Sequence, residues 1–536
     1  MRVLGLHKDP WHNTGAAAIR DDRGAVEIAY LAEERLDRIK DSRAFPVRST
    51  AACLSQIGLA SPDEADLVVL DYICSRDWRK DEFHKPCRTD TFLNDISERK
   101  IAVIGHHLAH AAVTFYSSPF AEAAILIVDG RGSDKETQSL FVGGAKGIEL
   151  VESTSAIGIG LLYAAVTQVI GFGLLQEGKT MGLAPYGAER GGPILPIQKR
   201  YSGISTDYSD LCIEDSYDLR RLLRPIETFD DKARAAWEVQ KECEEAMLHL
   251  AAYAKEETGM RYLCLSGGVA LNSVANNMIL RSGLFRDIFI NPAASDTGIP
   301  LGCALYGYHA LMGGPRRKTP LTAYLGPAYD KQEYLRVLGG ADGLHVIEKD
   351  ATEEAAKLLA RNLIVACCRG RSEMGPRSLG NRSIFVSPLK AENKDILNHR
   401  VKHRESFRPF APAVLEENAQ EYFEINRPSP FMLLVPAVRE EKRAVIPAVT
   451  HVDGTARLQT VSRAENAPFY DLIAAFGRQT GVPVLLNTSF NVAGEPIVET
   501  PADALRCMQG TEIDALLLDD ALAIKKSSLE EVKRVA

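Results

Sequence analysis

Tyr262-Leu263-Cys264-Leu265-Ser266-Gly267-Gly268-Val269-Ala270-Leu271-Asn272 is the stretch of sequence that decides the fold of this chain. It opens with an apolar run of strand length, and a glycine turn separates this run from a helical segment that extends through Asn276. A glycine turn between a strand and a helix N-terminus is a common phosphate-binding element of α/β proteins. Such turns also occur for packing reasons alone, so the turn by itself leaves both interpretations open.

The stretch belongs to the second of two similar series of elements. In the first series we expect strands at 3–6, 16–19, 26–32, 67–70, 101–104 and 124–128, and helices at 47–58 and 107–116. In the second series we expect a helix over 231–257, the strand over 262–265, a strand over 288–291 and a helix over 298–311. Two α/β halves with glycine turns at strand ends predict a ligand cleft between them.

The length of 536 residues suggests roughly two to four domains. The clearest boundary is Gly313-Gly314-Pro315-Arg316-Arg317-Lys318, after which the composition changes, so we expect domains at 1–320 and 321–536. No apolar run reaches the roughly 18–20 residues that cross a bilayer, and the N-terminus opens on a strand and not on a signal peptide. These features predict a cytoplasmic protein with no membrane partner.

Charge and cysteine content narrow the classes of function. The chain has 63 lysines and arginines against 71 aspartates and glutamates, a net charge of -8. Proteins that bind nucleic acids normally carry a broad basic surface, so a nucleic-acid partner is disfavoured. The ten cysteines form no Cys-x-x-Cys motif, which predicts reduced thiols in the core.

Cations are nevertheless concentrated around Gly375-Pro376-Arg377-Ser378-Leu379-Gly380-Asn381-Arg382-Ser383. Arginine matches phosphate or carboxylate oxygens two at a time, and the glycines let backbone amides approach the same anion. The basic residues alternate with turn-forming residues and lack the spacing of an exposed helix, which disfavours a solvated charged surface. We therefore expect a pocket for a phosphorylated substrate or nucleotide. Residues 369–408 include Arg369, Arg371, Arg377, Arg382, Arg400, Lys402, Arg404 and Arg408.

A possible metal site begins at Gly-His-His-Leu-Ala-His-Ala-Ala, residues 105–112. If this segment is helical, His106 and His110 project from one face and could hold one metal, whereas His107 points away. Asp129, which ends an apolar strand, and Asp296, in a loop before a helix, could complete the site. Two histidines with carboxylates suit Fe, Mn or Zn. The alternative is that the histidines form a polar helix start.

His12 follows the first predicted strand, in Trp11-His12-Asn13-Thr14-Gly15, and is expected at the edge of the same cleft. A lone histidine is more often structural than catalytic. Near a metal and a phosphorylated ligand, however, a neutral imidazole could take a proton from a hydroxyl group, so His12 is our candidate base.

Together these motifs resemble the O-carbamoyltransferase family of natural-product biosynthesis, which includes the nodulation-factor, cephem and tobramycin carbamoyltransferases. The resemblance covers essentially the whole chain. Besides the segments already quoted, the matching motifs are Glu33-Glu34-Arg35 with Lys40, Phe45-Pro46, Val128-Asp129-Gly130, Val401-Lys402 with Arg404-Glu405, Arg408-Pro409-Phe410-Ala411-Pro412 and Leu486-Asn487-Thr488-Ser489-Phe490-Asn491.

The resemblance implies an α/β fold with two different domains. The N-terminal domain would be actin-like or sugar-kinase-like, a duplicated RNase H-like fold with a cleft, and would hold Fe²⁺ or another divalent metal on His106, His110, Asp129 and Asp296. The C-terminal domain would be YrdC-like. There ATP, with Mg²⁺, and carbamoyl phosphate would give carbamoyl-adenylate, and the carbamoyl group would then pass to a small-molecule alcohol with release of AMP.

The resemblance also implies roles for single residues. His12 and Lys40 would be catalytic. The phosphate-bearing ligands would be bound by Ser266, Gly267, Gly268, Asn272, Arg377, Arg382, Lys402, Arg404, Arg408, Asn487 and Ser489.

Two other functions stay open from the sequence. One is a tRNA threonylcarbamoyl-type transferase, which the acidic balance disfavours. The other is a non-enzymatic, actin-like nucleotide-binding module, which would leave the cationic segment unexplained. The acceptor alcohol has no readable signature, and a homodimer is the default expectation for the assembly.

Overall fold

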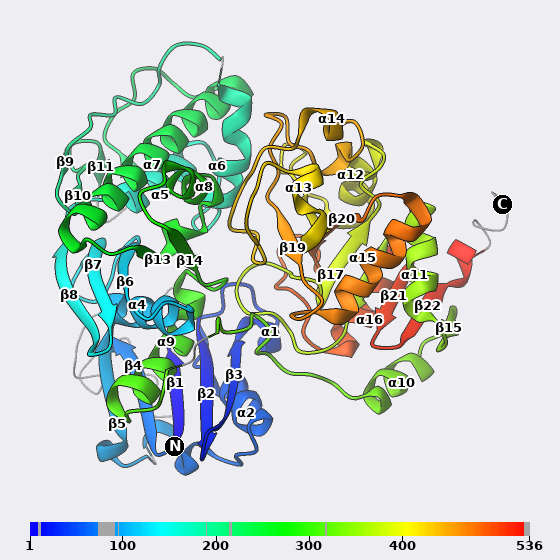
Figure 1. The fold of residues 1–536 in the computed structure, drawn as a ribbon. Helices are drawn as coiled ribbons and strands as arrows, with labels where there is room; N and C mark the ends of the chain where they lie inside the picture. The colour runs from blue at the N-terminus through cyan, green and yellow to red at the C-terminus, as the bar shows by residue number, and fades with distance from the viewer. Residues whose placement is uncertain are drawn as a thin grey trace. The chain divides into compact units, whose positions relative to one another are not determined.

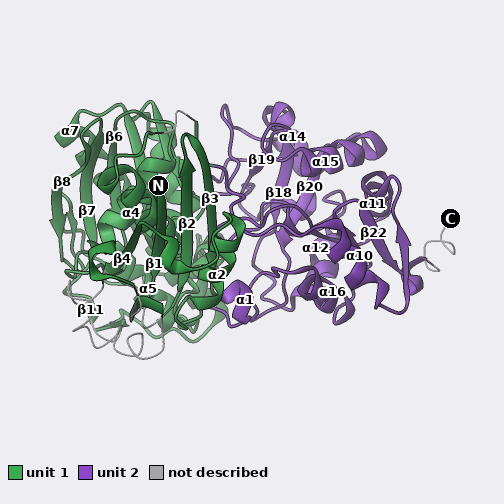
Figure 2. Cartoon of the chain, turned by 90° about the horizontal axis from the view of Figure 1, so that it is seen from below, with its two compact units in different colours: residues 1–33, 41–321 green, residues 34–40, 322–536 purple. Residues whose placement is uncertain are grey.

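The computed structural model describes residues 1–8, 12–72, 92–94, 96–188, 190–213, 217–316 and 319–529. The chain divides into two compact units (Figure 2): residues 1–33 with 41–321, and residues 34–40 with 322–536. We call residues 34–40 the crossover segment, because they belong to the second unit although the chain on either side of them belongs to the first. The division expected from the sequence placed this segment in the first domain.

The first unit contains two five-stranded sheets of the same design (Figure 1). In each sheet three consecutive strands form an antiparallel meander, and two later strands run parallel to the first of them. One sheet has the order β3-β2-β1-β4-β5, and the other has the order β8-β7-β6-β13-β14. This repetition confirms the predicted duplicated α/β architecture.

The strands of the first sheet are β1 (Arg2–His7), β2 (Gly15–Asp22), β3 (Ala25–Ala32), β4 (Leu67–Tyr72) and β5 (Ile101–Gly105). Those of the second are β6 (Ala123–Val128), β7 (Gln138–Gly144), β8 (Gly147–Thr154), β13 (Tyr262–Ser266) and β14 (Asp287–Ile290). The strands β7 and β8 were not expected from the sequence. The remaining strands follow the expected apolar runs.

Two helices, α4 (His106–Ser117) and α9 (Ile299–Tyr306), pack closely against each other and against the sheets. Small residues make this possible: a Cβ on Gly302 would lie 2.1 Å from the carbonyl oxygen of Ala109, and one on Gly5 would lie 2.1 Å from that of Pro300. The long helix α7 (Phe229–Thr258) begins with a capping box of Thr228 and Asp231. Further helices of this unit are α2 (Val47–Gln56), α5 (Ile159–Val169), α6 (Glu177–Leu183) and α8 (Ser273–Ser282).

The second unit is built on one mixed eight-stranded sheet with the order β15-β22-β21-β16-β17-β20-β18-β19. Its strands are β15 (Leu344–Ile347), β16 (Val365–Cys368), β17 (Arg382–Val386), β18 (Ala411–Leu415), β19 (Gln459–Val461), β20 (Val484–Ser489), β21 (Ala515–Leu518) and β22 (Ala521–Lys525). It is a mixed α/β domain with an open sheet, as expected for the second domain.

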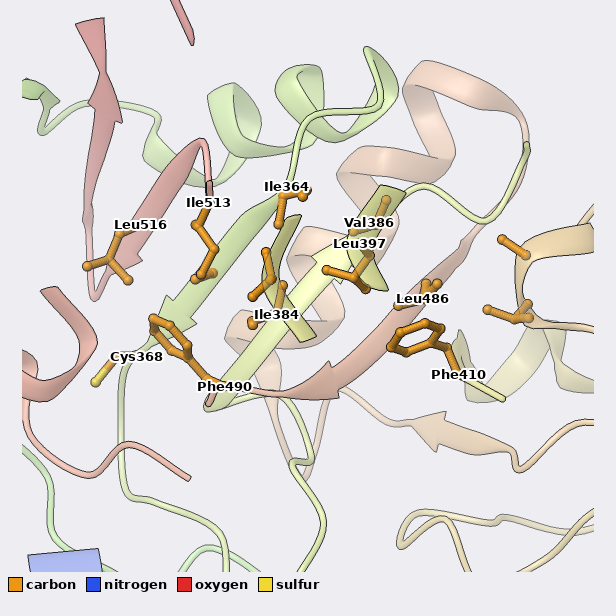
Figure 3. Packing of buried hydrophobic residues seen from close by; sticks show 14 of the residues in the cluster. Ile364, Cys368, Ile384, Val386, Leu397, Phe410, Leu486, Phe490, Ile513 and Leu516 are labelled. Carbon is orange, nitrogen blue, oxygen red and sulfur yellow. The ribbon is translucent and has the colours of Figure 1, made fainter. Parts of the chain in front are cut away.

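Alternation along the strands gives this sheet two buried faces. Val365, Cys367 and Phe385 face the helices α11 (Ala351–Ala360) and α15 (Ala467–Thr480). The neighbouring residues Cys368 and Ile384 belong to a second core, shown in Figure 3, with the helices α10 (Lys331–Gly339), α12 (Glu392–Leu397) and α16 (Pro501–Gln509). Phe410 and Phe490 follow the predicted phosphate-binding residues Arg408 and Ser489 closely in sequence. Both phenylalanines pack in this core and so anchor the chain beside those residues.

The cysteines that the structure describes agree with the expectation of reduced core thiols. The free, buried ones are Cys53, Cys212, Cys243, Cys264, Cys303, Cys367, Cys368 and Cys507. Cys74 and Cys87 lie outside the described residues. Among the described residues, none of the helices has the length and apolar character needed to cross a membrane.

Candidate functional site

The strand ends of the first unit bring together the four residues predicted to hold a metal. His106 begins α4 directly after β5, and Asp129 directly follows β6. Asp296 lies in the short 3-10 helix Asp296–Gly298, which follows β14. His110 lies one turn along α4 from His106, as the spacing predicted. One ligand atom from each of the four residues lies within 4.8 Å of the others.

Hydrogen bonds fix the orientation of the His106 ring. Its Nδ1 lies 2.9 Å from Oδ2 of Asp71 in β4. An ionised carboxylate cannot donate, so Nδ1 carries the proton. In the neutral ring Nε2 therefore carries no proton and has a free lone pair. The Nε2 atom lies 3.4 Å from Oδ2 of Asp129 and 3.5 Å from Oδ1 of Asp296.

His110 is oriented in the same sense by Ser266, the last residue of β13. The Ser266 hydroxyl donates to the carbonyl oxygen of Ala294 at 2.9 Å, so it accepts from Nδ1 of His110 at 3.2 Å. Nε2 of His110 then directs its lone pair at Asp129 and Asp296, with distances of 3.1 and 3.4 Å. Two imidazole lone pairs and two carboxylates thus face one another.

A positive charge is needed to make this arrangement stable. Burial alone would lower the pKa of His106 and His110, but the neighbouring carboxylates raise both values above the ordinary one. Burial would raise the pKa of Asp129 and Asp296, but the two histidines hold both values far below the usual range. The four side chains could therefore hold either protons or a cation. Two nitrogens and carboxylate oxygens fit a divalent transition metal such as iron, manganese or zinc.

His107 and His12 lie beside the cluster. His107 bonds through Nδ1 to the Ser139 hydroxyl at 2.7 Å, and burial lowers its pKa well below the ordinary value, so it stands apart as predicted. Nδ1 of His12 lies 3.6 Å from Oδ2 of Asp296 and accepts a hydrogen bond of 3.0 Å from the Asn13 amide. The structure thus places His12 beside the four residues predicted to hold a metal. Trp11, of the same sequence motif, lies outside the described residues.

The glycine turn after β13 is used differently from the simple phosphate loop considered above. Gly267 has a φ of 91°, and a Cβ there would lie 2.3 Å from the carbonyl oxygen of Val128, so only glycine fits. The amide of Gly268 donates to Oδ1 of Asp129 at 2.8 Å. Asn272 caps α8 and bonds to Gln240. The turn therefore orients a carboxylate of the cluster, and its predicted contact with a nucleotide stays a prediction.

Two groups of arginines in the second unit differ in their partners. Members of the first group donate to acceptors of the protein itself. Arg382, which is fully buried, donates to the carbonyl oxygens of Glu499, Arg369 and Gly370 and to the Glu499 carboxylate. Arg369, Arg371 and Arg400 likewise bond to main-chain carbonyls or to acidic side chains. Arg382 thus shapes the loop that carries Arg377. Its position fits the supporting role predicted for Arg382.

The second group is a cluster of half-buried arginines whose positive charges repel one another. It consists of Arg377, Arg404, Arg408 and Arg457, which we call the arginine cluster. Burial lowers the pKa of Arg377 to about 10 and that of Arg404 to about 9, with the charge of Arg408 contributing to both shifts. Within the described part of the chain, buried Nε atoms of three members have no hydrogen-bond partner, and these are Arg377, Arg404 and Arg457. Glu405 is an acidic neighbour of two members: it lies 3.6 Å from Arg408, and its charge partly offsets the lowered pKa of Arg404.

Arg457 was not predicted from the sequence. It lies two residues before Gln459, the first residue of β19, in a stretch without any motif. Burial lowers its pKa well below the ordinary value, and the charges of the other three arginines lower it further. The only signal in the sequence is the spacing of two between Arg457 and Gln459, which puts both on one face of an extended strand. Gln459 in turn accepts from the predicted residue Asn487 at 2.8 Å.

Lys402 and Ser489 lie together beside this cluster. The Lys402 ammonium donates to the carbonyl oxygens of Ser489 and Asn491, both at 2.8 Å, and to Oδ1 of Asn491 at 2.7 Å. Burial lowers the pKa of Lys402, and the charges of Arg404, Arg408 and Lys40 lower it further. Lys40, from the crossover segment, is therefore part of the same cationic region. The predicted residues Arg377, Lys402, Arg404, Arg408, Asn487, Ser489 and Lys40 thus gather in the second unit.

Comparison with protein families gives two matches that together extend over most of the chain. Residues 72–305 match the family model described as the carbamoyltransferase N-terminus, and residues 356–525 match the carbamoyltransferase C-terminus. Nodulation protein NolNO of Sinorhizobium fredii is 38% identical, over 98% of this chain and 81% of its own. Nodulation protein NolO of Bradyrhizobium diazoefficiens is 39% identical, over 81% of both chains.

Solved structures are more distant. HypF of T. kodakarensis is 13% identical, with a TM-score of 0.35, over 60% of this chain and 49% of its own. A ROK family glucokinase from Streptomyces griseus is 9% identical, with a TM-score of 0.29, over 57% of this chain and 98% of its own. At these TM-scores the function rests on the sequence relatives and on the geometry of this chain.

Proposed function

This chain belongs to the carbamoyltransferase family, and from that premise we propose that it is an ATP-dependent O-carbamoyltransferase acting on a hydroxyl group of a small natural product. ATP, carbamoyl phosphate and water would give carbamoyl-adenylate, pyrophosphate and phosphate. The carbamoyl group would then pass to the alcohol, whose proton is released, and AMP would leave. The observation that carries the proposal is the arginine cluster, which brings four positive charges together in a half-buried position.

For the first step we assign phosphate binding to the arginine cluster. Two phosphorylated substrates bring several negative charges together, and clustered guanidinium groups offset that repulsion. Lys402 shapes the site by holding Ser489 and Asn491 in place. We assign Arg382 and Asn487 a supporting role, because their polar groups bond to neighbouring protein atoms.

For the second step we assign proton transfer to His12, which lies next to Asp296. His106, His110, Asp129 and Asp296 would hold a divalent metal, and iron is our choice for the native ion. When bound, such a metal supplies a Lewis acid that polarises a carbonyl or phosphoryl oxygen. Hydrogen bonds to Asp71, Ser266 and Gly268 hold the ligand atoms of His106, His110 and Asp129 in place.

The test is to incubate the purified protein with ATP and carbamoyl phosphate in the absence of an acceptor. We expect pyrophosphate release that needs both substrates and that falls by a factor of about 30 or more in Arg377→Ala, as for a lost charge-assisted contact. Pyrophosphate release that does not depend on carbamoyl phosphate would contradict the proposal, and so would unchanged release by the variant.

A further inference from the structure

The two sheets have the same design, and a second set of polar residues lies at the corresponding strand ends of the first sheet. In the second sheet, Asp129 follows the first strand, β6, and Ser266 ends the fourth, β13. In the first sheet, the corresponding strands are β1 and β4. His7 ends β1, and Asp71 lies one residue before the end of β4.

His7 and Asp71 are linked to each other and to the cluster. Nδ1 of His7 lies 2.8 Å from Oδ1 of Asp71, and Nδ1 of His106 lies 2.9 Å from Oδ2 of the same carboxylate. All three side chains are almost completely buried. The two oxygens of Asp71 are thus each engaged by one imidazole, and both imidazoles must donate, because the carboxylate cannot.

We propose that Asp71, held in place by His7, is the positioning residue that prepares His106 for a metal by fixing the proton on Nδ1. This inference rests on the metal assignment in the proposed function. Asp71 does for His106 what Ser266 does for His110: each accepts from Nδ1 and leaves Nε2 as a lone pair directed at the carboxylates. Carboxylate partners of this kind orient histidine ligands and make them more basic.

The arrangement also explains an otherwise unfavourable feature. Nε2 of His106 is a buried atom with no hydrogen-bond partner in the described part of the chain. A proton on Nε2 instead of Nδ1 would let His106 bond to Asp129 or Asp296 and would close the site. Asp71 prevents this in the neutral ring, because the proton that it accepts must stay on Nδ1.

The test measures binding of Co²⁺ alone to the full, chelator-treated chain, by titration and by the visible absorption spectrum of the bound ion. Asp71→Asn leaves one acceptor for the two Nδ1–H groups of His7 and His106. Where its NH2 group faces His106, it donates to Nδ1 and the proton of the neutral ring moves to Nε2. We expect the affinity for Co²⁺ to fall by a factor of about 10–100, as for other lost partners of histidine ligands. The absorption spectrum should change as well.

Asp21→Asn is the matched control, because Asp21 is a buried carboxylate of the same sheet that bonds to Tyr308 and Gly24, away from the cluster. It should bind Co²⁺ like the wild type. A second pair keeps the test decisive if Asp71→Asn does not fold. His7→Gln keeps a donor for Asp71 and should retain Co²⁺ affinity, whereas His7→Leu removes the donor and should lower it.

Two outcomes would overturn the inference, and they can be told apart. Wild-type affinity and spectrum in both Asp71→Asn and His7→Leu, with Co²⁺ bound by the wild type, would overturn the role of Asp71 and leave the metal assignment intact. Failure of the wild type to bind Co²⁺ or Fe²⁺ would overturn the metal assignment and this inference together.

Discussion

Arg377 and Arg457 lie so close that the charge of Arg377 adds to the effect of burial in lowering the pKa of Arg457. Both guanidinium groups stay protonated near pH 7. Like charges in a half-buried position repel one another, and this repulsion lowers the stability of the fold. An anion bound among the arginines would offset this repulsion. Three predictions about the second unit depend on this relationship or on the loops around it.

Replacing Arg457 should improve stability and impair binding. In Arg457→Gln one of the four charges is lost, so we expect the ligand-free protein to gain on the order of 1–2 kcal/mol in free energy of unfolding. The affinity for carbamoyl phosphate should fall at the same time. Arg400→Gln is the matched control, because Arg400 is paired with Glu512 and Asp514, both at 3.0 Å, and this variant should lose stability. Denaturant unfolding and calorimetric titration give both quantities, and a loss of stability in Arg457→Gln would contradict the picture.

Pyrophosphate should stabilise the protein against heat. An anion present at about 100 times its dissociation constant adds about 2.7 kcal/mol to the free energy of unfolding. For a unit of this size that corresponds to a rise in Tm of roughly 5–10 °C. Sodium chloride at the same ionic strength should not produce this rise. Arg377→Gln should reduce the shift, and an equal shift in that variant would mean that the anion binds elsewhere.

The crossover segment should matter for the second unit. Arg38 donates to the carbonyl oxygens of Ile497 and Pro496, at 2.7 and 2.8 Å, and the neighbouring carbonyl oxygen of Glu495 accepts from Asn491, a partner of Lys402. Arg38→Ala should therefore cost about 1.5–3 kcal/mol of stability and raise the KM for carbamoyl phosphate. The exposed Arg336 of α10 is the control for the loss of a surface charge. A KM equal to that of Arg336→Ala would show that the loop holds its position without Arg38.

The metal-free first unit should lose stability as the pH rises. The carboxylates raise the pKa of His106 and His110 in the folded state, so the protonated pair stabilises the fold below the unfolded value near 6.5. This contribution disappears as the pH rises through the raised folded pKa values. Thermal scans of chelated protein from pH 6 upward should show a falling Tm. Metal-loaded protein should not show this loss, because the cation takes the place of the protons. Identical pH profiles with and without metal would contradict the prediction.

Changing His12 should separate the two steps of the reaction. His12→Asn removes the candidate base next to Asp296 but leaves the second unit unchanged. We expect normal pyrophosphate release and a fall in carbamoylated product by a factor of about 10²–10⁴. Product and pyrophosphate are measured in the same reaction. Wild-type product yield would exclude His12 as the base, and an equal loss of both products would mean that the two steps are not separable.

Local patterns in the sequence were enough to predict much of the first unit. Apolar runs of strand length predicted β1, β4, β6 and β13, and the spacing of four predicted that His106 and His110 share a helix face. These predictions succeeded because each depends on residues close in sequence. The strands β7 and β8 were missed, and β8 explains why: as an edge strand that is mostly exposed, it lacks a regular apolar face.

The sites themselves depend on contacts between residues distant in sequence. The grouping of His106 and His110 with Asp129 and Asp296 was predicted, but other contacts of this kind were not. Eight basic residues around 369–408 were treated as one group, but burial and partners separate Arg377 from Arg382, only five residues away. Arg457 joins the cluster through the sheet, and Asp71 reaches His106 across two neighbouring strands. A single sequence contains no signal for such pairings when one partner, here Arg457 or Asp71, lies outside every motif.

The crossover segment also sets the order of events during synthesis. Arg35 contacts the carbonyl oxygen of Glu373, which follows it by 338 residues along the chain. At about 5–20 residues per second, the ribosome needs roughly 20–70 s to make that distance. During this interval the first unit can fold, but residues 34–40 stay exposed to water because their partners have not yet been made. An arginine side chain stays soluble in this state because its charge is well solvated, whereas an exposed apolar segment would be prone to aggregate. The polar character of this segment thus suits a chain that leaves the ribosome from its N-terminus.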